Sequence, residues 1–162
     1  MEKLELSQEE IEQRVAILKR FKTLLIEQRK KFQEYLKVLE LQENKIEQED
    51  TESLLKHSQL ETEIVASIGS LQKVIVPMQK LYNESKIASY NPQEAIPIEN
   101  IQDDLKKLQS KVLQQNEKNR TLLKEHMSYL KEQIMNFKNP CKNRSSIYAS
   151  RATSGSRIAF EV

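Results

Sequence analysis

The sequence predicts an all-α fold, an antiparallel three-helix bundle or coiled coil of long helices with a flexible C-terminal tail. Two glycines, four prolines and no tryptophan among 162 residues leave little of the turn chemistry that a many-stranded sheet needs. Apolar residues recur at spacings of three, four and seven over three long stretches, which is the helical period. We therefore expect a helical bundle over residues 1–138 and a mobile tail over 139–162.

The first helix is expected from about residue 7 to 47. Ser7 with Glu10 three residues later forms a capping box, the signature of a helix start. Its apolar stripe comprises Ile11, Val15, Leu18, Phe21, Leu25, Phe32, Leu36, Leu39 and Ile46. A stripe of this length cannot be buried by the helix alone, so partner helices are required. Further apolar residues at Ile17, Leu24 and Val38 leave a dimer open.

The second helix is expected over about 51–84, with Asp50, Thr51 or Ser53 as its cap. Its stripe comprises Leu54, Leu60, Ile64, Ile68, Leu71, Ile75, Met78 and Tyr82. Pro77 lies inside this stripe, and its missing N–H predicts a kink. We expect the helix to continue beyond the proline because the apolar period does.

Residues 85–98, with Pro92 and Pro97, are expected to form the connection to a third helix over about 98–138. The third stripe comprises Ile101, Leu105, Leu108, Val112, Leu122, Leu123, Leu130, Ile134 and Phe137. Amides at Gln115, Asn116 and Asn119 interrupt it. Polar residues at such positions fix helix register in many bundles, and contact with a partner is the alternative.

The sequence contains no recognisable catalytic motif. It contains no glycine-rich phosphate loop, nucleophile elbow or paired-cysteine metal spacing. His57 and Glu61 are four residues apart, but two ligands make an incomplete metal site, and His126 fits the edge of a helix stripe. We expect no enzyme activity, no cofactor and no metal. The lysines of "QRKK" (28–31) and Lys106–Lys107 stand among acidic residues, which favours solvated helix faces over nucleic-acid binding.

The expected location is the cytoplasm. The single cysteine, Cys141, has no intrachain partner, which favours a reducing compartment. The first residues lack the pattern of a secretory signal, and no stretch approaches the roughly 18 apolar residues of a membrane span. We expect no membrane insertion.

The tail differs from the rest of the chain. Residues 139–162 carry four basic side chains against one acidic, and five serines, so they should be mobile in isolation. Ile158, Phe160 and Val162 nevertheless alternate with other residues, as on one face of an extended strand. Such a segment could pair with a partner's sheet edge, enter a groove, or fold back on its own bundle.

The run "NEKNRTLL" (116–123) followed by "SIYASRATSGSRI" (146–158), on a charged helical body, resembles the FlgN-type flagellar export chaperones. The resemblance implies a cytoplasmic chaperone that binds hook–filament junction proteins and delivers them to the flagellar type III export apparatus. It also implies cargo binding near the C-terminus. The positions that fit are Leu130, Ile134, Phe137, Ile147, Tyr148, Ile158 and Phe160.

A different class of function remains open on the residues alone. A structural coiled-coil or tethering protein would show the same stripes, would self-associate, and would be captured by a scaffold through its C-terminal tail. Self-association without cargo would favour this alternative.

Overall fold

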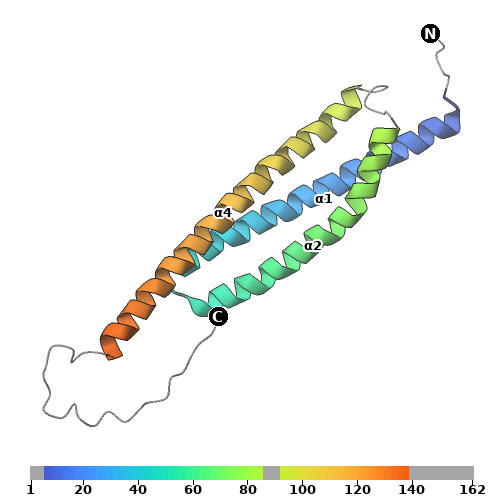
Figure 1. Cartoon of the computed structure of the whole chain (residues 1–162). Coiled ribbons are helices and arrows are strands. Elements are labelled where there is room, and N and C mark those ends of the chain that lie inside the picture. Colours follow the sequence, from blue (N-terminus) through green and yellow to red (C-terminus); the bar gives the residue numbers. More distant parts are fainter. Residues whose placement is uncertain (1–5, 86–91, 139–162) are drawn as a thin grey trace, which may run out of the picture. The chain divides into compact units, whose positions relative to one another are not determined.

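The computed structural model describes residues 6–85 and 92–138, and three long helices account for nearly all of them (Figure 1). The helices are α1 (Gln8–Glu47), α2 (Thr51–Glu84) and α4 (Pro92–Lys138). No strand occurs in these two ranges, so the all-α prediction is confirmed. The chain divides into two compact units, Met1–Leu123 and Lys124–Val162.

The ends of α1 and α2 form as the sequence predicts. The Glu10 backbone N–H donates to Ser7 Oγ at 3.2 Å, and the Ser7 N–H donates to the Glu10 carboxylate at 2.9 Å. Asp50 caps α2, because its carboxylate accepts from the Ser53 N–H at 3.1 Å. Glu49 has a φ of 56°, a left-handed conformation that reverses the chain between the two helices.

Contacts between the helices of Met1–Leu123 fix their directions. Gln28 Nε2 of α1 donates to Gln72 of α2 at 3.4 Å, and Tyr35 Oη donates to Glu61 at 3.0 Å, so α1 and α2 are antiparallel. Arg29 of α1 pairs with Asp104 of α4 at 3.0 Å, and the Glu43 carboxylate pairs further along with Lys118. These two helices are therefore parallel, and the unit is an up-down-up three-helix bundle, as Figure 1 shows.

The core lies between all three helices. It contains Leu18, Phe21, Leu24, Leu25, Ile75, Tyr82, Ile98, Ile101 and Leu105. The rings of Phe21 and Tyr82 stack with their centroids 4.9 Å apart. Leu24 and Val38, which the sequence left available for a dimer, are only 2% and 6% exposed. Because α1 touches two neighbours, its buried face is wider than one stripe. Ile11 and Val15, in contrast, are exposed.

The third helix begins at Pro92, so the expected start at residue 98 was wrong. Pro92 takes the first helical position, where no backbone N–H is needed. Pro97 lies inside the helix and lacks the N–H that would reach the carbonyl four residues earlier. Ala95 and Ile98, three residues apart, are both buried, and their burial offsets that loss.

Helix α2 passes through Pro77 and continues to Glu84, in agreement with the expectation that the proline does not end it. The ribbon of α2 bends in its green C-terminal part (Figure 1). Ile75 before the proline and Tyr82 after it are both buried, so tertiary contacts hold the helix on either side. Over the described residues, no helix has an apolar stretch long enough to cross a membrane.

Candidate partner-binding surface

The C-terminal turns of α4, in the unit Lys124–Val162, expose an apolar stripe. It consists of Met127, Leu130, Ile134 and Phe137, which are 53%, 46%, 54% and 85% exposed. Their spacing of three, four and three residues places them on one side of the helix. Apolar side chains exposed along one helix face are unfavourable in water, which makes this stripe a candidate for contact with a partner.

Three of the predicted site residues, Leu130, Ile134 and Phe137, thus lie together on this stripe. Met127 belongs to it too, although sequence reasoning omitted it. The signal was available, since Met127 stands three residues before Leu130 in the same period. Ile147, Tyr148, Ile158 and Phe160 lie outside the described residues, as does the rest of the tail, and their role stays a prediction.

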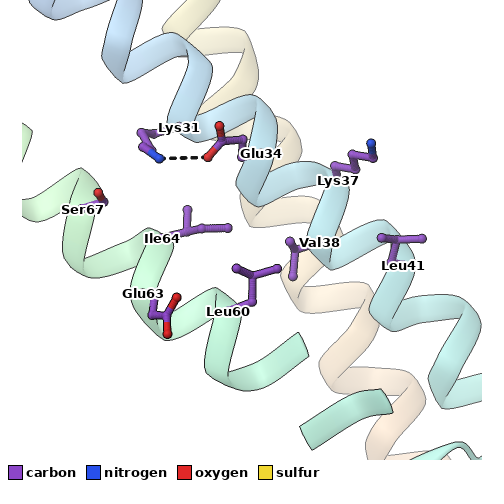
Figure 2. Close-up of a pocket in the computed structure, with 9 residues that line it drawn as sticks. All are labelled: Lys31, Glu34, Lys37, Val38, Leu41, Leu60, Glu63, Ile64 and Ser67. Carbon is purple, nitrogen blue, oxygen red and sulfur yellow. Dashed lines mark hydrogen bonds and ion pairs between the residues drawn. The ribbon is translucent and has the colours of Figure 1, made fainter. Parts of the chain in front are cut away.

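A second apolar surface lies in Met1–Leu123, in a groove of about 480 Å³ between α1 and α2. Figure 2 shows Leu60 and Ile64 of α2 facing Val38 of α1. Lys31 Nζ and the Glu34 carboxylate pair at 3.0 Å on its rim. The groove is open, and its apolar lining could contact an apolar side chain. Two of the charged groups at its rim, Lys31 and Glu34, already pair with each other.

The amides that interrupt the third stripe hold α4 against α1. Asn119 is 3% exposed; its Nδ2 donates to the Leu39 carbonyl at 2.8 Å, and its Oδ1 accepts from Gln115 Nε2 at 3.0 Å. Gln115 also donates to Glu43, which pairs with Lys118. For Gln115 and Asn119 the register interpretation is confirmed. The hydrogen bond from Lys118, followed by that from Gln115, lowers the pKa of Glu43.

A second polar cluster joins α1 to α2. The Glu61 carboxylate accepts from Tyr35 Oη at 3.0 Å and from Gln42 Nε2 at 2.8 Å. Burial, then the charge and hydrogen bond of Glu61, raise the pKa of Tyr35 to about 12. Glu61 is thus engaged in the bundle interface, while His57 Nδ1, four residues earlier, has no hydrogen-bond partner in the part of the chain that the structure describes.

The described residues combine polar contacts between helices with exposed apolar side chains. Within 6–85 and 92–138, no three His, Cys, Asp or Glu side chains gather as metal ligands. His126 is half-buried next to the exposed stripe. The polar clusters join helices to each other, and Phe137, the most exposed large apolar side chain of the described ranges, stands on the stripe.

The sequence of this chain is similar to a known protein family. The model of the family described as "FlgN protein" matches residues 17–155. A protein of Treponema pallidum (strain Nichols), described as an uncharacterized protein, is 39% identical over 138 residues, which cover 85% of this chain and 86% of that protein. No solved structure matches. The resemblance seen in the sequence is confirmed: the chain belongs to the FlgN family, a family of chaperones for flagellar export.

Proposed function

We propose that this FlgN-family protein is a cytoplasmic chaperone that binds hook–filament junction proteins through the C-terminal turns of α4 and the tail, and delivers them to the flagellar type III export apparatus. The observation that carries the proposal is the exposed stripe of Met127, Leu130, Ile134 and Phe137.

Two apolar stripes, one on the chaperone and one on its partner, can cover each other. Proteins that assemble through amphipathic helices expose such a stripe while they are monomeric, and a chaperone with a matching stripe covers it. Full burial of a Leu, Ile or Phe side chain contributes about 1.5–3 kcal/mol relative to exposure. Each of the four stripe residues is about half exposed or more, so its burial by a partner supplies part of this free energy. Together these contributions offset the cost of ordering a partner segment.

The moderate affinity that results suits a chaperone that must release its cargo. Ordering a tail upon binding costs several kcal/mol of the gross interaction energy. Ile147, Tyr148, Ile158 and Phe160 are proposed to add apolar contacts from the tail, and no catalytic or cofactor chemistry is part of the proposed function.

Binding of purified hook–filament junction proteins to the full-length chain, measured by titration calorimetry, tests this proposal. The stripe variant L130S/I134S/F137S changes exposed side chains only, so it should fold as the wild type does. We expect its affinity to fall at least about tenfold, since partial loss of three apolar contacts exceeds about 1.4 kcal/mol.

The matched control is L55S/V76S/L113S, which removes three similarly exposed apolar side chains from α2 and from the first part of α4. It should bind as the wild type does. Equal binding by both variants would contradict the proposed site. Failure of every junction protein to bind, together with self-association of the chain, would instead favour the structural coiled-coil alternative.

A further inference from the structure

Three lysines accompany the exposed stripe of α4. Lys124, Lys131 and Lys138 are spaced by seven residues, and all three side chains are exposed. Seven residues make almost two helical turns, so the three ammonium groups stand in one line along the helix. None of the three is ion-paired with any residue in the described ranges, whereas Lys118 of the same helix pairs with Glu43.

The line of lysines borders the stripe on one side only. Successive residues of an α-helix are rotated by about 100° around its axis, which places the line of lysines roughly 80° around the axis from the middle of the stripe. The other border carries His126 and Gln133, and the two glutamates of this segment, Glu125 and Glu132, fall on the opposite face. Gln133 Nε2 donates to Tyr129 Oη at 2.6 Å, so this amide already has a hydrogen-bond partner on its own helix.

Cations next to an apolar seam select the partner of a helix. In paired helices, the residues that flank the seam meet the flanking residues of the partner, and their charges decide which helices pair. Lysine stems also extend the apolar surface while their ammonium groups stay in water. A partner with carboxylates at its flanking positions gains three ion pairs, and one with lysines or arginines there meets three like charges.

We infer that the stripe accepts an amphipathic helix whose apolar seam is bordered by glutamates or aspartates, and that Lys124, Lys131 and Lys138 discriminate against helices with basic borders. This inference rests on the proposed function, whose site it shares. It adds the charge of the partner as the property by which the protein chooses among helices with similar apolar seams.

Two synthetic helical peptides of about three heptads test the inference, both with leucine along the seam. One carries glutamate at the flanking positions and the other carries lysine there. Fluorescence anisotropy with the full-length chain should show tighter binding of the glutamate peptide by about tenfold, the sum of several exposed ion pairs. The preference should shrink at about 1 M salt, where charges are screened within roughly 3 Å.

Charge reversal in the full-length chain locates the effect. K124E/K131E/K138E should reverse the preference, so that the lysine peptide binds more tightly. K142E/R144E/R151E changes the net charge of the tail by the same amount and should leave the preference unchanged. A preference that follows the tail variant instead would overturn the inference, because the tail would then be the source of the selectivity.

The remaining outcomes separate this inference from the proposed function. Equal binding of both peptides, with junction proteins still bound through the stripe, would overturn the inference and leave the chaperone function standing. If neither peptide binds and the junction proteins also fail to depend on Leu130, Ile134 and Phe137, both fail together.

Discussion

The two ends of α4 show one sequence pattern in opposite environments. In the first part, Ile98, Ile101, Leu105 and Val112 recur at helical spacing and are buried against other helices. In the last turns, Met127, Leu130, Ile134 and Phe137 recur at the same spacing and are exposed. The apolar period therefore specifies that the helix has an apolar face. It does not specify whether other helices of the same chain bury that face.

The two ends of α4 also differ in the side chains that they carry. The buried part ends in Gln115 and Asn119, whose hydrogen bonds favour one alignment of α4 with α1. The exposed stripe contains methionine and phenylalanine, and a methionine side chain adapts to differently shaped surfaces. One helix thus carries a stretch that polar contacts hold against α1 and a stretch whose apolar side chains are exposed.

Substitutions of one buried and one exposed isoleucine should separate the two ends of α4 by the largest difference in stability. Ile98 is fully buried and Ile134 is 54% exposed. We expect Ile98→Ala to lower the free energy of unfolding by about 2–5 kcal/mol, because it leaves a cavity in the core. Ile134→Ala should change it by no more than about 0.5 kcal/mol. Urea denaturation followed by circular dichroism measures both values.

The junction-protein affinity of the same two variants completes this test. Ile134→Ala should weaken binding although it leaves stability intact. A large loss of stability in Ile134→Ala would show that the last turns of α4 belong to a cooperative core, and that the two ends of the helix are alike in this respect.

Removal of the buried amide should have the next largest effect. Asn119→Ala deletes the donor to the Leu39 carbonyl and one of the two acceptors of Gln115 Nε2, so we expect a loss of about 1–3 kcal/mol in the free energy of unfolding. The matched control is Asn116→Ala, at a half-buried position on the same helix, which should cost less than half as much. Equal losses of unfolding free energy for the two variants in chemical denaturation would show that Asn119 does not fix the register of α4 against α1.

The smallest expected effect concerns the Tyr35–Glu61 contact and alkaline pH. The pKa of Tyr35 is raised from 10 to about 12, so the folded protein holds this proton more tightly than the unfolded chain. This contribution is complete below about pH 10 and is lost as the pH rises through about 12. Tyr35→Phe should therefore lose less stability than the wild type between these two pH values, by on the order of 1 kcal/mol.

Denaturation curves across that range, with Tyr82→Phe as the comparison, check the assignment. Burial, followed by the charge of Glu99, raises the pKa of Tyr82 as well, so that variant should retain the part due to Tyr35. Identical pH profiles for wild type and Tyr35→Phe would mean that neither the burial of Tyr35 nor its contact with Glu61 raises its pKa in solution.

The sequence could predict the helix ends that neighbouring residues form. The wrong prediction for the start of α4 has a physical cause. The capping box at Ser7 and the cap at Asp50 are formed by neighbouring residues, so the sequence could place them. The start of α4 was misplaced by six residues because the burial of Ala95 and Ile98, which depends on α1 and α2, outweighs the preference of Pro97 against a helix interior.

The candidate site shows the same division. Periodicity alone selected Leu130, Ile134 and Phe137, and the omitted Met127 fits the same period. It could not select the polar contacts between helices, such as Glu61 with Tyr35 and Gln42, because partners 19 to 26 residues apart in the chain meet only when α1 and α2 pack.

The sequence by itself determined that this protein is helical, where two of its helices begin, which faces are apolar, and which family it resembles. Those properties depend on residues within a few turns of one another. Only the tertiary structure decided which faces are covered. Leu24 and Val38 are buried in the core, and Asn119 donates a hydrogen bond to the Leu39 carbonyl. The stripe from Met127 to Phe137 is exposed to solvent. Burial depends on the approach of segments far apart in the chain, and a helical period carries no information about that approach.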